Sequence, residues 1–112
     1  MSAGGWIGVD LDGTLAEYGT WKGADPIGLP VVPMLDRVKA WLSDGVVVKI
    51  FTARVAFDED GSVRKTIEDW CLLHVGVVLP VTHAKDYGMI ELWDDRCVQV
   101  VPNTGQRADG KP

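Results

Sequence analysis

The chain has 112 residues, a net charge of −5, a hydrophobic fraction of 46% and five tryptophans. This length suits one compact domain and is too short for two, and the apolar content indicates a filled core rather than disorder. The acidic balance provides no basic surface for capturing nucleic acid, which argues against a dedicated nucleic-acid-binding module. A bound metal could still change the local field and bring a nucleic-acid end to one site.

Cysteine usage and the N-terminus bear on the compartment. The two cysteines, Cys71 and Cys97, lack metal-site spacing and are too few for a disulfide scaffold. The first residues lack the basic region and apolar run of a signal peptide, and no stretch approaches a transmembrane span. We therefore expect a cytoplasmic protein without membrane contact.

The first half of the chain alternates strand and helix patterns. Residues 6–9 form a short apolar run that predicts a buried strand, and the Gly- and Pro-rich residues 15–32 predict an irregular flap. Pro33 suits a first helical position, and apolar residues follow helical spacing from there to Gly45. The β-branched residues 46–51 then predict a second strand.

The second half continues the pattern. Residues 58–61 read as an acidic loop, and the apolar face of a second helix follows, formed by Val63, Ile67, Trp70 and Cys71. Further strands are expected at residues 77–81, 89–93 and 98–101. The tail at residues 102–112 is predicted to be disordered.

Strands separated by helices indicate right-handed β–α–β units around a parallel sheet. We therefore expect one α/β domain over residues 1–101, Rossmann-like and three-layered, with a mostly parallel central sheet of about five strands. The spacers leave no room for a large cap domain. Ligands of such sheets bind outside the carboxyl ends of the strands.

Two carboxylates follow the first strand, in Asp10-Leu11-Asp12-Gly13-Thr14. A carboxylate such as Asp10 can attack phosphorus when a divalent cation offsets the repulsion between the anions, and hydrolysis then proceeds through an aspartyl-phosphate. The second carboxylate, Asp12, can protonate the leaving oxygen and later activate water. In isolation, this motif would more often be a solvated turn.

Polar residues follow the other predicted strands as well. The tripeptide Thr52-Ala53-Arg54 supplies candidate substrate-binding residues, because a hydroxyl and a guanidinium both hold phosphoryl oxygens. Lys85, beyond the third strand, could offset negative charge at a phosphoryl group. Asp94 and Asp95, after the fourth, offer the hard oxygens that suit Mg²⁺.

Each of these residues alone has an ordinary explanation, as an end-of-strand threonine, a surface lysine or arginine, or an acidic turn. Four such signals at four strand ends, in one order, indicate a single site.

The chain resembles the haloacid dehalogenase superfamily. Val9-Asp10-Leu11-Asp12-Gly13-Thr14-Leu15 matches the first motif of that family, Ile50-Phe51-Thr52 looks like the second, Lys85 like the third and Trp93-Asp94-Asp95 like the fourth. The resemblance implies that Asp10 is the nucleophile, Asp12 the general acid and base, and Thr52 and Lys85 phosphoryl binders. It also implies a magnesium ion held by Asp10, the Asp12 backbone carbonyl and Asp94, with Asp95 as a further candidate ligand.

We therefore predict a magnesium-dependent phosphomonoester hydrolase whose substrate is a small phosphorylated metabolite or a nucleotide. An alternative is a phosphatase of nucleic-acid 3′ ends, because Thr52-Ala53-Arg54 and Asp94-Asp95-Arg96 resemble the phosphatase domain of polynucleotide kinases, and the flap aromatics Tyr18 and Trp21 could stack on a base. A phosphoryl-accepting regulatory domain without turnover and an inert scaffold are two further alternatives. The roles of Arg54 and Arg96, the substrate and the oligomeric state stay open.

Overall fold

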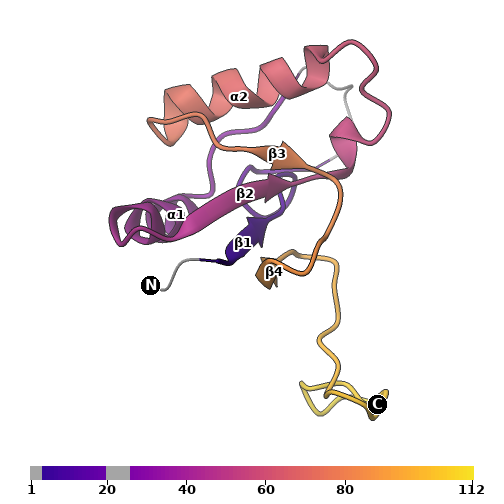
Figure 1. The fold of residues 1–112 in the computed structure, drawn as a ribbon. Coiled ribbons are helices and arrows are strands. Elements are labelled where there is room, and N and C mark those ends of the chain that lie inside the picture. The colour runs from indigo at the N-terminus through magenta and orange to yellow at the C-terminus, as the bar shows by residue number, and fades with distance from the viewer. Residues whose placement is uncertain (1–3, 20–25) are drawn as a thin grey trace.

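The structure, a computed structural model, describes residues 4–19 and 26–112 of the chain (Figure 1). Trp21, one of the two predicted flap aromatics, lies outside these residues. The described chain forms the following elements in order: β1 (Trp6–Val9), α1 (Val32–Ser43), β2 (Val47–Phe51), the 3₁₀ helix η1 (Ala53–Val55), α2 (Ser62–His74), β3 (Val81–Thr82) and β4 (Met89–Trp93).

The strands form one parallel sheet in the order β3-β2-β1-β4. This confirms an α/β fold built on a parallel sheet. The chain moves from β1 outward to β2 and β3, and then returns to place β4 on the other side of β1 (Figure 1). The strand order therefore reverses at β1, and β1 and β4 end side by side.

Both helices pack against the same face of the sheet. Two successive right-handed crossovers in one direction place α1 and α2 on one side. The core contains alternate strand residues together with residues from the inner faces of both helices: Ile7, Val9, Val48, Ile50, Met34, Val38, Ile67, Trp70 and Cys71. The described domain therefore has two layers, and the predicted third layer is wrong, because no described helix covers the opposite face.

The opposite face is crossed by the loop of residues 83–88 that connects β3 to β4. This loop covers Trp6, whose indole Nε1 donates a hydrogen bond of 2.9 Å to Asp86. The Nζ of Lys49 lies 4.5 Å from the centre of the same ring, a cation–π contact. Further along this face, Val47 is 50% exposed.

The third strand lies later in the chain than predicted. Residues 77–81 were expected to form it, but pairing is confined to Val81 and Thr82. Val77 and Val78 are about half exposed in the connection after α2, while Leu79 fills the core. The apolar run at residues 77–81 therefore indicated a partly buried segment but did not indicate which of its residues pair with β2.

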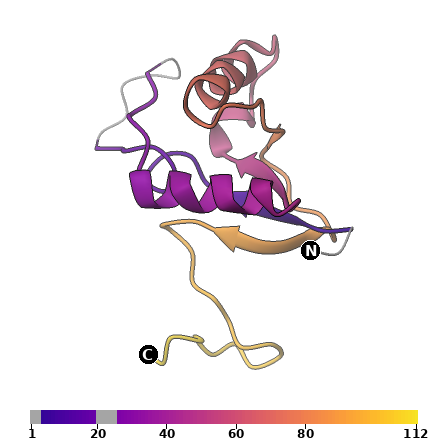
Figure 2. The ribbon, with the colours of Figure 1, turned by 90° about the vertical axis from the view of Figure 1, so that its left-hand side faces the viewer.

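The predicted fifth strand at residues 98–101 is absent from the described structure, so the sheet has four strands. Val98, Val100 and Val101 are exposed, and the backbone around them pairs only within the tail, where Val100 forms an antiparallel bridge with Arg107. The C-terminal segment extends away from the sheet and both helices (Figure 2). Its β-branched composition favours extended backbone but gives it no strand to join.

None of the described helices has the length and apolar character needed to cross a lipid bilayer.

Candidate functional site

The chain makes a tight turn as it leaves β1. The Asp10 N–H donates to the Trp93 carbonyl at 2.9 Å, which ties the end of β1 to the end of β4. Leu11 and Leu15 are fully buried and anchor the turn from below. The polar residues between them are therefore held at the carboxyl edge of the sheet.

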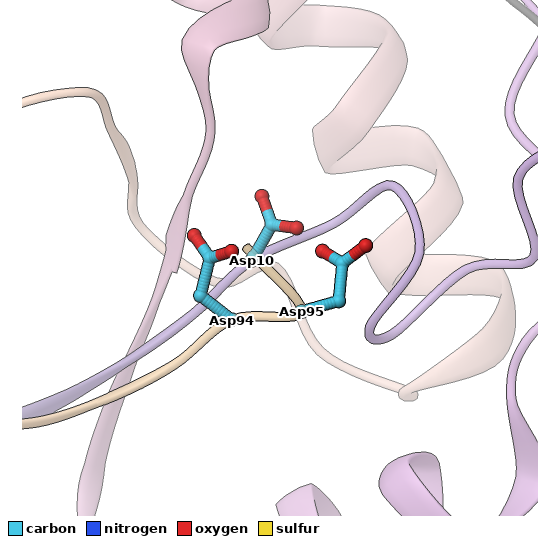
Figure 3. A group of neighbouring side chains, drawn as sticks. All are labelled: Asp10, Asp94 and Asp95. Carbon is cyan, nitrogen blue, oxygen red and sulfur yellow. The ribbon is translucent and has the colours of Figure 1, made fainter. Parts of the chain in front are cut away.

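Three carboxylates converge at this edge. Asp10, Asp94 and Asp95 each place an oxygen so that all three oxygens lie within 4.8 Å of one another. The three side chains come from the ends of β1 and β4 and are directed toward a common space (Figure 3). The strand order explains this convergence, because β1 and β4 are parallel neighbours with Val9 opposite Trp93.

Thr14 links the two halves of this carboxylate cluster. The Asp95 N–H donates to Thr14 Oγ1 at 3.1 Å, and the Thr14 hydroxyl lies 3.4 Å from Asp10 Oδ2 and 3.4 Å from Asp95 Oδ1. A hydroxyl has one proton, so it donates to one of these carboxylates at a time. The sequence placed Thr14 in the first motif, but no local pattern indicated a contact with Asp95.

Gly13 allows the turn to approach Asp95 closely. Its φ angle is +88°, a conformation that side chains disfavour, and a Cβ on Gly13 would lie 2.5 Å from Asp95 Oδ2. The positive φ favours glycine at this position, and an added Cβ would displace the Asp95 carboxylate.

The pKa of Asp10 is raised from 3.8 to about 7. Burial is the largest cause, followed by the negative charge of Asp94, the hydrogen bond and charge of Asp95, and the charge of Asp12. All of these effects disfavour a further negative charge. Three carboxylates held this close together form a donor set suited to a divalent cation such as Mg²⁺, because the cation would relieve their mutual repulsion.

The second carboxylate of the first motif has a different partner. Arg54 Nε donates to Asp12 Oδ2 at 2.6 Å, and Arg54 Nη2 donates to Asp12 Oδ1 at 2.8 Å. The Arg54 side chain is only 4% exposed, whereas Asp12 is 19% exposed. The structure thus places Arg54 against Asp12, while its predicted contact with substrate stays a prediction.

One pocket of about 630 Å³ opens over these groups. It is lined by Asp10, Asp12, Tyr18, Phe51, Thr52, Ala53, Arg54, Asp94, Asp95 and Arg96. Every predicted site residue except Lys85 therefore belongs to this lining. Lys85 is exposed on the loop after β3, and its predicted contact with a phosphoryl group stays a prediction.

The end of β2 shapes the floor of the pocket. Thr52 is 3% exposed, and its Oγ1 accepts a hydrogen bond from the Arg54 N–H at 3.2 Å. This contact starts the single turn of η1 and fixes the path of the chain from Thr52 to Arg54. The Thr52 hydroxyl keeps its own proton for a further acceptor.

Comparisons with protein-family models, with curated proteins and with solved structures found no match to this chain.

Proposed function

We propose that this protein is a magnesium-dependent phosphomonoester hydrolase, a small uncapped enzyme of the haloacid dehalogenase type, with Asp10 as the nucleophile. The observation that carries the proposal is the convergence of Asp10, Asp94 and Asp95 beside Asp12 in a single pocket. The close match of residues 9–15 to the first motif of that superfamily supports the same assignment.

The metal would be held by Asp10, Asp94 and Asp95, with the Asp12 backbone carbonyl as a further candidate ligand. These carboxylates lie close enough together to share one ion, and the raised pKa of Asp10 reflects negative charge that a cation would offset. When bound, Mg²⁺ supplies charge neutralisation between a phosphoryl group and the attacking carboxylate.

The proposed reaction has two steps. In the first, an oxygen of Asp10 attacks phosphorus, the bond from phosphorus to the leaving oxygen breaks, and the leaving oxygen takes the proton of Asp12. In the second, Asp12 takes a proton from water as the water oxygen attacks the aspartyl-phosphate. The bond between phosphorus and Asp10 breaks, releasing inorganic phosphate and restoring both side chains.

Phosphoryl oxygens would be held from two sides. The Thr52 hydroxyl accepts from Arg54 and can donate its proton to a phosphoryl oxygen on the pocket side. Arg96 brings a positive charge to the pocket from the turn after β4. Lys85 lies outside the pocket lining and Arg96 lies within it, so Arg96 is the better placed cation of the two.

The pocket volume of about 630 Å³ is within the range of small-molecule sites and suits a phosphorylated metabolite or a nucleotide. A second candidate substrate is a nucleic-acid 3′ end. It is favoured by Tyr18, which lines the pocket and is 47% exposed, because an exposed aromatic ring can stack on a base.

The test is phosphate release from p-nitrophenyl phosphate with magnesium and with EDTA. Wild-type protein should turn over many times per site only with magnesium, and Asp10→Asn should abolish turnover. Asp36→Asn, at an exposed position of α1, serves as the matched control and should retain full activity.

Nucleotides and 3′-phosphorylated oligonucleotides should be tried in the same assay. Phosphorylation of Asp10 that stops at one equivalent per chain would instead support a regulatory domain. A folded, magnesium-loaded protein that hydrolyses none of these phosphates would contradict the proposal.

A further inference from the structure

We propose that Arg54 is a positioning residue for Asp12, holding its carboxyl group ready to exchange a proton with the leaving oxygen. This inference rests on the proposed function, because Asp12 acts as an acid only on a phosphate ester. It replaces the substrate-binding role that the sequence suggested for Arg54.

The geometry of the pair supports this role. Arg54 contacts both oxygens of Asp12 through two nitrogens, at 2.6 and 2.8 Å, which fixes the plane of the carboxyl group. Each carboxylate oxygen has two lone-pair positions, and this bidentate contact uses one on each. The remaining positions stay available to a substrate or a water molecule.

The two side chains of the pair also differ in exposure to solvent. Arg54 is 4% exposed and Asp12 is 19% exposed, so the carboxyl group is the member of the pair that solvent reaches. Both residues line the pocket, so the difference in side-chain exposure is what separates them. If Arg54 mainly bound an incoming phosphate, we would expect its guanidinium to be more exposed than the Asp12 carboxylate.

Arg54 is itself held in place by further hydrogen bonds. Its backbone N–H donates to Thr52 Oγ1 at 3.2 Å, and its Nη2 donates to the Pro26 carbonyl at 3.1 Å. The pair is therefore tied to the end of β2 and, through Pro26, to the predicted flap. Such support fixes a catalytic group before substrate binds.

The consequence depends on the leaving group. An alkoxide leaves only when it receives a proton, whereas p-nitrophenolate is stable enough to leave without one. Loss of a correctly oriented Asp12 should therefore slow the hydrolysis of alkyl phosphates far more than that of p-nitrophenyl phosphate.

The experiment compares kcat/KM for glycerol 2-phosphate and p-nitrophenyl phosphate in wild type and in Arg54→Lys, which keeps the charge but loses the bidentate contact. The ratio kcat/KM reports only the steps up to departure of the leaving group, so it is not affected by the rate at which the aspartyl-phosphate is hydrolysed. We expect a loss of about 100-fold on glycerol 2-phosphate and of less than about threefold on p-nitrophenyl phosphate. Because both substrates are measured on one preparation, the ratio is independent of the folded fraction.

The chain provides a matched control in Arg107, which makes the same bidentate contact with Asp109, at 2.9 and 3.1 Å, in the exposed tail. Arg107→Lys should change neither rate. An equal loss on both substrates in Arg54→Lys, or no loss on either, would overturn the inference while leaving the proposed function standing.

A measurement without turnover tests the pair itself. The Arg54 Nε–H should give a slowly exchanging signal in nitrogen-edited proton spectra, and Asp12→Asn should abolish that protection. A rapidly exchanging Nε–H in an active wild type would overturn the inference alone. Wild-type inactivity on every phosphate, despite a protected Nε–H, would overturn the proposed function and the positioning role of Arg54 together.

Discussion

Gly13 is the residue at which backbone geometry and the charges of the site meet most closely. It combines a φ of +88° with an approach to Asp95 so close that a Cβ would displace the Asp95 carboxylate. A substitution there should therefore act on two quantities, the stability of the fold and the position of a proposed metal ligand.

We predict that Gly13→Ala lowers the free energy of unfolding by about 1–3 kcal/mol and weakens Mg²⁺ binding at least about tenfold. Gly45→Ala is the matched control, because Gly45 has a similar φ of +80° but nothing within 4 Å of its added Cβ. It should lose only about 1 kcal/mol and keep the metal affinity. Denaturant unfolding and magnesium titration by calorimetry measure both quantities. Equal effects of the two substitutions on magnesium affinity would contradict this prediction.

At the residue scale, the sequence carries more information about position than about partners. Asp10, Asp94 and Asp95 could be expected at one sheet edge because each follows a strand that the apolar pattern marks. The pairing of Arg54 with Asp12 could not be expected, because the two residues are 42 positions apart and their contact depends on the direction in which the Arg54 side chain leaves η1. No periodic pattern encodes such a contact.

Among the elements, β2 has one face packed against the helices and one face that no described helix covers. Val48 is 1% exposed beneath the helices, while its neighbour Val47 is 50% exposed on the face without a helix. Two identical substitutions, one residue apart, therefore test the two-layer arrangement directly.

We predict that Val48→Ala lowers the free energy of unfolding by about 2 kcal/mol, through lost burial and the cavity that remains. Val47→Ala should lower it by less than about 0.5 kcal/mol, because little apolar surface returns to water. Urea unfolding measures both variants. A loss of similar size at both positions would indicate that the open face is covered in solution.

The elements were predictable to the extent that apolar periodicity determines them. Residues 6–9 and 89–93 were expected as strands and are β1 and β4, and the expected helices are α1 and α2. The short β3 and the absence of residues 98–101 from the sheet were not predictable, since pairing depends on a neighbouring strand and not on composition. The number of layers was not predictable either, because it depends on the order in which the strands join the sheet.

For the protein as a unit, the charges of the site should determine how the free energy of unfolding depends on pH. The pKa of Asp10 is raised from 3.8 to about 7 in the folded protein. Folding therefore favours the protonated form, and this contribution is fully present below pH 4 and lost as pH rises to about 7.

We predict that Asp10→Asn stabilises the metal-free protein at pH 8 and has little effect at pH 4. The shift would correspond to about 4 kcal/mol at a fully buried site, and solvent screening at this partly exposed carboxyl reduces it to roughly 1–2 kcal/mol. Urea unfolding in EDTA across this pH range measures the difference, which should grow between pH 4 and 7. A difference that is independent of pH would refute the prediction. Magnesium should then stabilise wild type more than the variant.

The pairing of β1 with β4 has a kinetic consequence. Thr14 and Asp95 are 81 positions apart, so this pairing closes the longest loop in the sheet and costs a folding chain the most entropy to find. The three carboxylates of the site meet only when β4 takes its place, so their repulsion opposes that closure and assists its reversal. Acid or a divalent cation, by removing the repulsion, acts on the same event. Completing the fold and completing the site are one step.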